Sequence, residues 1–436
     1  MEAERKTEME GIEEQDNIQV RKESTKKNGF LWGLLTGVLL MAVFCCVTLL
    51  IFTFRAKESA ESKQKENQQY TLVRLDNNGP ITPAVLEKMQ NVMELIHRRF
   101  YLDEVTDEQL LDGMYKGMVA ALEDPFSEYY TVEELQKLLS DTSGVYYGIG
   151  AYVSIDQTYN MTKVSGVIAG SPAEEAKLRA NDIIYEIDGV STYEMSLDEA
   201  VKLIKGDEGT ETVLTIIRDG ETLKVPIIRR KVESPTVNSE MLPQNMGYLQ
   251  IVQFDDVTPG QFKLALDGLK EQGMKGLILD LRANPGGTLD GVVDIAGQIL
   301  PEGLIVYTED KEGKRNEYYS DGKGELQIPI VVLVDMNTAS AAEILSGAIQ
   351  DYEKGTIIGT TTYGKGIVQS VISLPDDSAV KITVSAYYTP KGRSIHKLGI
   401  EPDIVCEFDA DAYYGEEAFD NQLEKAKEVL TEKMKE

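Results

Sequence analysis

The sequence predicts an α/β protein that combines a membrane anchor, a helical N-terminal region, a β-rich module and an α/β core. An uncharged apolar run covers residues 30–54, apolar residues recur at helical spacing from 82 to 140, and strand and helix patterns alternate from about 235 to 406. The predicted parts are a cytoplasmic tail (1–29), a transmembrane signal anchor (30–54), a linker (55–80), the helical region (81–140), the β-rich module (141–231), the core (232–406) and a helical tail (407–436).

The composition excludes several classes of function. The 436 residues include 44 basic and 73 acidic ones, and the net charge of −29 repels phosphate backbones, so we expect no nucleic-acid partner. Two of the three cysteines, Cys45 and Cys46, lie in the apolar run, and only two histidines are present. These counts exclude a disulfide framework and a metal centre rich in cysteine or histidine, and we expect neither metal nor cofactor.

The apolar run is long enough to cross a membrane. At about 1.5 Å per residue its 25 residues span a hydrocarbon layer of about 30 Å. No small-residue cleavage site follows it, which favours a retained anchor over a cleaved signal peptide. The nearby basic residues do not decide its orientation, because they flank both ends: Arg21, Lys22, Lys26 and Lys27 before it, and Arg55, Lys57, Lys63 and Lys65 after it.

Amphipathic helices are predicted at both ends of the part that follows the anchor. In the helical region the apolar positions are Val85, Met89, Val92, Met93 and Ile96, then Leu110, Leu111, Met114, Met118 and Leu122. The pair Asp124-Pro125 ends the second helix, and a further helix is predicted from Asp420. These helices serve either a homodimer contact or packing within the chain. We expect His97 to be a packing or surface residue.

The β-rich module contains a candidate peptide-binding loop. A hairpin turn at Asp219-Gly220 and a helix start at Ser171-Pro172 mark a compact fold of strands with two short helices. The loop Tyr147-Gly148-Ile149-Gly150 precedes a strand, and its glycines allow successive backbone N–H groups to converge on an anion. Taken alone, such a segment is more often a simple turn than an anion-binding loop.

The core alternates strands with helices, which predicts a partly parallel sheet. The expected strands are 248–254, 276–281, 328–334 and 356–359, and the expected helices are 259–272, 289–300 and 341–351. A long hairpin of residues 367–374 and 380–388 follows them.

Ser340 is the candidate nucleophile. A buried strand at residues 330–334 leads through a turn to a helix that begins near Ser340, with small residues on both sides of the hydroxyl. The first N–H groups of a helix lack partners inside it, so they can point at an oxyanion that forms beside this hydroxyl. Alternatively, Ser340 only caps the helix.

Lys365 is the candidate general base. Gly364 and Gly366 flank it at the entry to an apolar strand, so it can be carried inward at little steric cost. Its pKa must fall from about 10.4 towards about 7–8, which desolvation can achieve. Gln369 lies four residues on, hence on the same face of a regular strand, and can orient the amine. Alternatively, Lys365 is a solvent-exposed loop lysine.

A glycine-rich loop follows the strand at residues 276–281. Its sequence is Asn284-Pro285-Gly286-Gly287. These glycines can offer a second backbone N–H group to the oxyanion, or else form only a tight connection between a strand and a helix.

Taken together, these motifs resemble those of the carboxyl-terminal processing peptidases, the Ser–Lys tail-specific proteases of family S41, over roughly residues 80–430. The β-rich module resembles a PDZ domain of the bacterial protease-associated type. Tyr147, Gly148, Ile149 and Gly150 resemble the loop of such a domain that binds a peptide C-terminus. Further shared motifs are Asp124-Pro125-Phe126-Ser127-x-Tyr129, Gly399-Ile400-x-Pro402-Asp403 and Asp420-x-Gln422-Leu423.

The resemblance implies a crotonase-like serine-protease core and a role for each site residue. Ser340 would be the nucleophile, Lys365 the general base and Gln369 its orienting partner. The N–H groups of Ala341 and of Gly286 or Gly287 would form the oxyanion hole. The family generally works outside the cytoplasm, which implies a cell-membrane protein with a cytoplasmic N-terminus and an extracytoplasmic catalytic part.

Two positions depart from the family pattern. Ala342 stands where relatives often carry a serine, at a position we expect to be structural. Lys205 stands where some relatives use an arginine to couple the peptide-binding module to the active site. The second departure leaves regulated gating open.

The sequence thus predicts a membrane-anchored serine endopeptidase that cleaves proteins near their C-termini. Its substrates would be proteins or peptides with free C-termini, held by the PDZ-like module. One alternative is a catalytically inactive PDZ-containing scaffold that only binds peptides. Another is a hydrolase assisted by His396, which lies in a loop-like segment better suited to a surface or structural role.

Overall fold

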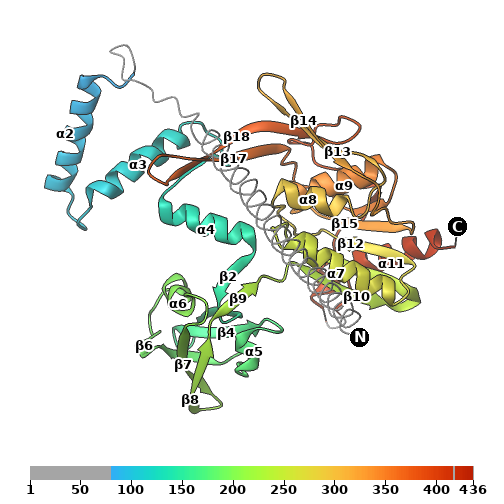
Figure 1. The fold of residues 1–436 in the computed structure, drawn as a ribbon, viewed down its shortest axis with the longest axis horizontal. Coiled ribbons are helices and arrows are strands. Elements are labelled where there is room, and N and C mark those ends of the chain that lie inside the picture. Colours follow the sequence, from blue (N-terminus) through green and yellow to red (C-terminus); the bar gives the residue numbers. More distant parts are fainter. Residues whose placement is uncertain (1–79, 416–417, 436) are drawn as a thin grey trace, which may run out of the picture. The chain divides into compact units, whose positions relative to one another are not determined.

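The computed structural model describes residues 80–415 and 418–435, which form two units divided after Glu104 (Figure 1). The first unit holds helix α2 (Pro83–Arg99), which begins with a Thr82 cap and a proline in its first turn and has no buried residue. The predicted tail and anchor, and the linker up to residue 79, lie outside the described residues. Within the described part, no helix has both the length and the apolar character needed to cross a bilayer.

The second unit opens with helices α3 (Asp107–Ala120) and α4 (Val132–Ser143). Between them lies strand β1 (Glu128–Tyr130), which pairs antiparallel with β18 (Ala379–Tyr388). The purely helical prediction for residues 81–140 is therefore wrong at β1. A three-residue strand is too short to show an alternating pattern in the sequence.

The β-rich module contains a sheet in the order β3-β4-β5-β7-β8, with β6 beside β5. Its strands are β3 (Ala151–Asp156), β4 (Met161–Val167), β5 (Ile183–Ile187), β6 (Val190–Ser191), β7 (Glu211–Arg218) and β8 (Glu221–Ile228). Its helices are α5 (Pro172–Glu175) and α6 (Leu197–Ile204). The predicted hairpin turn joins β7 to β8. Strands β2 (Val145–Gly148) and β9 (Arg230–Glu233) pair with each other where the chain enters and leaves the module.

The core is built on a sheet in the order β10-β11-β12-β15-β16-β19, in which only β10 runs antiparallel to its neighbour. The strands are β10 (Val237–Leu242), β11 (Met246–Ile251), β12 (Gly276–Asp280), β15 (Ile330–Val334), β16 (Thr356–Gly359) and β19 (Ile404–Val405). A short 3-10 turn, η1 (Pro243–Asn245), links β10 to β11. The predicted partly parallel sheet is thus present, although β10 and β19 were not predicted.

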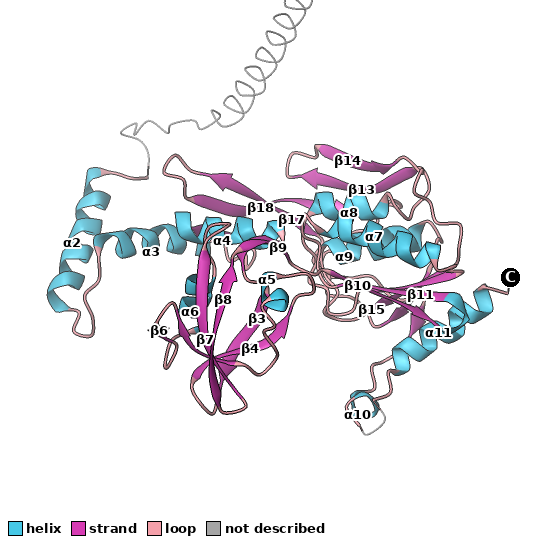
Figure 2. Ribbon diagram, turned by 60° about the horizontal axis from the view of Figure 1, so that its bottom comes forward, coloured by secondary structure: helices cyan, strands magenta, loops and turns pink. Residues whose placement is uncertain are grey.

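Helices cover both faces of this sheet (Figure 2). They are α7 (Thr258–Glu271), α8 (Leu289–Ala296) and α9 (Ala341–Asp351) on one face and α11 (Asn421–Lys433) on the other, with the short α10 (Ala410–Tyr413) before α11. Side chains alternate along β15, so that Val332 and Val334 pack with the first group and Val331 and Leu333 pack with α11. The buried strand β15 therefore fixes the point at which the chain turns into α9.

A second sheet of the core contains β1, β18, β13 and β14 in that order, with β17 also paired to β18. Its further strands are β13 (Gly303–Asp310), β14 (Arg315–Ser320) and β17 (Ile367–Ser373). The β17–β18 hairpin was predicted, whereas the β13–β14 hairpin was not. This sheet joins the N-terminal strand β1 to the strand that follows the candidate base.

Candidate active site

Ser340 lies at the turn between β15 and α9, as its N-cap residue, and is half-buried. Its backbone angles, φ 54° and ψ −117°, lie outside the usual regions for a residue with a side chain. Such backbone strain concentrates at functional sites. The turn is held by two hydrogen bonds, from the Thr338 hydroxyl to the carbonyl of Leu281 (2.8 Å) and from the Ala339 amide to the carbonyl of Asn284 (2.9 Å).

The carboxylate of Glu343 joins the Ser340 turn to the Lys365 loop. This side chain is fully buried in the first turn of α9. Its Oε2 accepts from the amides of Ser340 (2.8 Å) and Lys365 (2.9 Å). Its Oε1 accepts from the amide of Gly364 (2.7 Å) and the hydroxyl of Thr362 (2.6 Å). Because one oxygen accepts from both amides, the backbones of Ser340 and Lys365 lie close together in space.

Glu343 was not singled out from the sequence, although a signal was present. A serine at the start of a helix followed three residues later by a glutamate is a capping-box pattern. The pattern indicates a bond back to the Ser340 amide, which is found. It gives no indication that the same carboxylate also binds a loop more than twenty residues away.

Lys365 is half-buried, and its ammonium lies over the ring of Phe126, with Nζ 4.4 Å from the ring centroid. Burial lowers the pKa of this amine, and the nearby charge of Lys381 lowers it further. The charges of Asp124 and Glu343 raise it, but the pKa stays below its ordinary value. Among the described residues, no hydrogen bond joins the amine to the Ser340 hydroxyl.

Gln369 belongs to the same cluster but bonds a different partner from the one expected. Its Nε2 donates to the Thr383 hydroxyl (3.1 Å), which donates to Asp124 (2.7 Å). Lys365 precedes β17, and the register of β17 shifts between Val368 and Gln369. The prediction that the side chains of Lys365 and Gln369 share one face assumed a regular strand from residue 365 to residue 369. The structure does not have this regular strand.

The segment around Asp124 closes this cluster from the side of β1. Asp124 accepts from the Ser127 hydroxyl (2.6 Å) and the Phe126 amide (3.1 Å). Burial acts to raise the pKa of the Asp124 carboxyl, but the hydrogen bonds from Ser127, Thr383 and Phe126 hold the pKa below its usual value. Asp124 is therefore an anion whose charge acts on the Lys365 amine, and the motif at 124–129 is part of the candidate site.

The glycine loop of residues 284–287 lies against the nucleophile. A Cβ placed on Gly286 would lie 2.7 Å from the Cβ of Ser340 and 2.9 Å from the amide nitrogen of Ala341. The Gly286 amide itself is occupied, because it donates to the side chain of Asn284 (2.8 Å). Within the described residues, the amides of Ala341 and Gly287 have no hydrogen-bond partner. These two amides, rather than that of Gly286, are free to bind an oxyanion.

The candidate carboxylate-binding loop of the β-rich module has free amides as well. The side chain of Ile149 is buried in the core of the module, and Gly150 has φ 78°. In the described part of the chain, the amides of Ile149 and Gly150 have no hydrogen-bond partner. Gly148 ends strand β2, and the Tyr147 side chain is 45% exposed. The backbone of Ile149 and Gly150 is therefore the part of the loop that can receive an anion.

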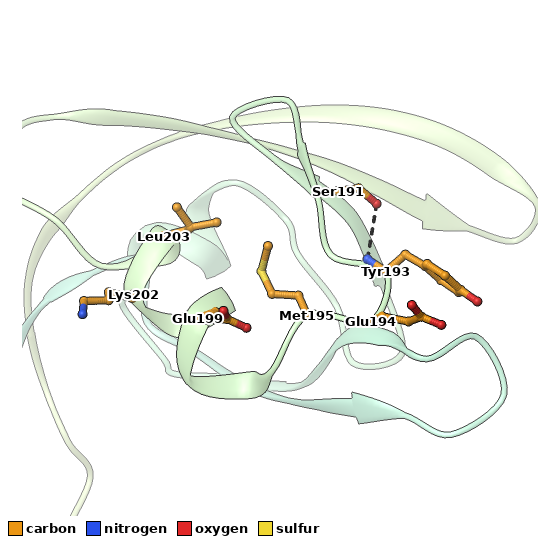
Figure 3. Close-up of a pocket in the computed structure, with 7 residues that line it drawn as sticks. All are labelled: Ser191, Tyr193, Glu194, Met195, Glu199, Lys202 and Leu203. Carbon is orange, nitrogen blue, oxygen red and sulfur yellow. Dashed lines mark hydrogen bonds between the residues drawn. The ribbon is translucent and has the colours of Figure 1, made fainter. Parts of the chain in front are cut away.

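A separate hollow of about 520 Å³ lies beside α6 (Figure 3). Its lining residues are Ser191, Tyr193, Glu194, Met195, Glu199, Lys202 and Leu203. None of the residues 147–150 lines it. The hollow is thus distinct from the candidate carboxylate-binding loop.

His396 is half-buried and lies beside the Lys365 loop, which agrees with the structural role that was one of the two expected for it. A Cβ on Gly366 would lie 2.3 Å from the His396 amide nitrogen, and His396 Nδ1 is buried without a partner among the described residues. A histidine that acts as base in a serine hydrolase is oriented through this nitrogen by a carboxylate. The absence of such a partner argues against a His396-assisted mechanism.

The closing motif at 420–423 is tied to the core sheet through Arg282. This guanidinium bonds Asp280 on β12, Asp420 (2.9 Å) and the side chain of Gln422 (3.1 Å). Asp420 also caps α11. The motif therefore fixes α11 against the sheet that carries the glycine loop.

The fold and this constellation define a serine peptidase core joined to a PDZ domain. The family model "Peptidase family S41" matches residues 245–406, and that of the PDZ domain matches residues 163–218. A third model, "Activating protease CtpB N-terminal domain", matches residues 44–134.

Named relatives extend this similarity over most of the chain. The carboxyl-terminal-processing protease of Synechocystis is 40% identical over 66% of this chain and 69% of its own length. The carboxy-terminal processing protease CtpA of Bacillus subtilis is 36% identical over 74% of this chain and 69% of its own length. A solved photosystem II D1 C-terminal processing protease is 31% identical, with 73% of this chain and 86% of that chain covered and a TM-score of 0.43. The chain belongs to the carboxyl-terminal processing serine proteases of family S41.

Proposed function

We propose that this protein is a membrane-anchored endopeptidase that cleaves proteins near their C-termini, with Ser340 as nucleophile and Lys365 as general base. The observation that carries the proposal is the shared acceptor Glu343 Oε2, which holds the backbones of Ser340 and Lys365 side by side. The lowered pKa of the Lys365 amine supports it further, because only the neutral amine can accept a proton.

The reaction follows from these groups. The Lys365 amine takes the proton of the Ser340 hydroxyl while the oxygen attacks the scissile carbonyl, and the amides of Ala341 and Gly287 bind the resulting oxyanion. The ammonium then protonates the leaving amine, and water hydrolyses the acyl-enzyme with Lys365 again as base. Before the first step, the amine must rotate from Phe126 to Ser340. Gln369, whose Nε2 donates to the Thr383 hydroxyl, is the residue proposed to orient the amine there.

The PDZ domain would hold the substrate by its chain end. The free amides of Ile149 and Gly150 can bind the terminal carboxylate, with Tyr147 and Gly148 completing the loop, and the edge of β3 can pair with the extended chain. A bound C-terminus would place the segment upstream of it within reach of Ser340.

The anchor and its orientation belong to the same proposal. The uncharged run at residues 30–54 supports a single span. The family resemblance, and not the flanking charges, is the ground for placing the catalytic part outside the cytoplasm. A homodimer remains a prediction. The exposed apolar side chains of α2, among them Val85, Val92 and Leu95, are compatible with it.

Cleavage of an unfolded protein with either a free or an amidated C-terminus tests the proposal. We expect the purified protein to cleave the free form faster, because the amide removes the charge that the loop at residues 147–150 binds. Ser340→Ala and Lys365→Ala should abolish cleavage, whereas His396→Gln should retain it. Binding of the free C-terminus without any cleavage would favour the inactive scaffold instead.

A further inference from the structure

Tyr387 lies on β18, and its hydroxyl reaches both candidate catalytic residues. The side chain is 1% exposed. The hydroxyl donates to the carbonyl oxygen of Ser340 (3.0 Å) and to that of Lys365, so one proton is shared between two acceptors. Burial and the charge of Glu343 hold the pKa of Tyr387 well above its ordinary value, so the hydroxyl keeps this proton at any working pH.

Glu343 and Tyr387 act on complementary groups of the same two residues. The carboxylate of Glu343 accepts from both amide N–H groups, and the hydroxyl of Tyr387 donates to both carbonyl oxygens. Each of Ser340 and Lys365 is therefore tied at both of its backbone polar groups. No such bond reaches the Lys365 side chain, whose ammonium lies over Phe126.

We propose that Tyr387 is a positioning residue that, together with Glu343, fixes the backbones of Ser340 and Lys365 relative to each other, so that the lysine side chain alone moves to reach the serine. The proposal rests on the function proposed above for this pair. A base held on a fixed backbone returns to the same place in every turnover, and an error of about 1 Å in such a placement can reduce a rate by about 100-fold.

The substitution Tyr387→Phe removes the shared hydroxyl and preserves the ring. Tyr352→Phe is the matched control, because the Tyr352 hydroxyl also donates to one backbone carbonyl, that of Leu304 (3.0 Å), away from the catalytic pair. With a peptide substrate, we expect Tyr387→Phe to lower kcat about tenfold or more with KM within about twofold of the wild type. Tyr352→Phe should change neither constant.

Amide hydrogen exchange gives a second readout that does not need turnover. In Tyr387→Phe the amides of Ser340 and Lys365, which donate to Glu343, should exchange faster than in the wild type, while Tyr352→Phe should leave them unchanged. Equal kcat values for the two variants, or unchanged exchange at residues 340 and 365, would overturn the proposal. If the Ser340→Ala variant still cleaves the substrate, the proposed function is contradicted instead. The exchange experiment would still decide the role of Tyr387.

Discussion

The ammonium of Lys365 lies over the ring of Phe126, with 4.4 Å between Nζ and the ring centroid. A cation gains from the electron-rich face of an aromatic ring, whereas a neutral amine does not. The contact therefore stabilises the charged form of Lys365 in a position away from Ser340. A general base must instead be neutral and within reach of the serine hydroxyl. The ring also belongs to the segment that carries Asp124, so ring and anion act on the amine together.

Replacing Phe126 with leucine should raise activity. Leucine preserves an apolar neighbour that desolvates the amine, but removes the cation–π contact, worth about 0.5–1 kcal/mol at a half-exposed site. We therefore expect kcat/KM to rise about two- to fivefold in Phe126→Leu, measured with a peptide substrate. Phe262→Leu, in the buried core on α7, controls for the loss of an aromatic ring elsewhere and should not raise the rate. A lower rate in Phe126→Leu alone would mean that the ring supports the active arrangement.

The pH dependence of the reaction should move in opposite directions in two variants. The rate rises with pH as Lys365 loses its proton, and this limb should lie below the ordinary lysine range because burial and Lys381 lower the pKa of the amine. The anion of Asp124 raises this pKa, so Asp124→Asn should shift the midpoint to lower pH. Lys381→Met removes a like charge, so it should shift the midpoint to higher pH. Profiles of kcat/KM against pH measure both shifts.

If the midpoint moves in the same direction in Asp124→Asn and Lys381→Met, the rise of the rate with pH reports the titration of a group other than Lys365. The Lys202→Met variant serves as a control for the loss of a positive charge, because Lys202 pairs with Glu133 at an exposed position outside the candidate site. Its midpoint should match that of the wild type.

The elements that the sequence predicted best are those whose signals are local. Helix α9 was predicted with its observed bounds, because a buried strand, a turn and small residues all fall within one short segment. The β13–β14 hairpin was missed because β14 is mostly exposed and polar, so it shows no apolar alternation. Its position is set by pairing with β13 and not by its own residues.

The candidate site divides in the same way. Ser340, Lys365 and the glycine loop stand in recognisable motifs. Tyr387 lies 47 residues from Ser340 in the sequence and 22 from Lys365, and it bonds only their backbones. No motif reports such a contact, because it depends on how the β17–β18 hairpin packs against the start of α9. The occupied amide of Gly286 likewise depends on the rotamer of Asn284.

Gly150→Ala should weaken the binding of free C-termini. Gly150 has φ 78°, and a Cβ there would lie 2.3 Å from the Cβ of Ser171, so the loop must shift. We expect the Kd of a peptide with a free C-terminus to rise tenfold or more, measured by calorimetry on the Ser340→Ala protein. Gly189→Ala is the matched control, because Gly189 has φ 82° with open space around it. Equal affinities in the two variants would remove the loop from the binding site.

Gly286→Ala should impair catalysis without weakening the capture of the chain end. The new Cβ would lie 2.7 Å from the Ser340 Cβ and 2.9 Å from the Ala341 nitrogen, so it must displace the nucleophile or an oxyanion amide. Loss of one oxyanion donor reduces kcat by about 100- to 1,000-fold, and we expect a loss of that order.

Gly313→Ala separates this effect from backbone strain in general. Gly313 also has a left-handed backbone, φ 80°, but nothing lies within 4 Å of the added Cβ. Both variants carry an alanine at positive φ, so both should lose stability, while only Gly286→Ala should lose kcat. Peptide affinity, measured on Ser340→Ala backgrounds, should be equal in the two, because the loop at residues 147–150 is untouched. If kcat in Gly286→Ala equals that in Gly313→Ala, the glycine loop does not contribute to the oxyanion site.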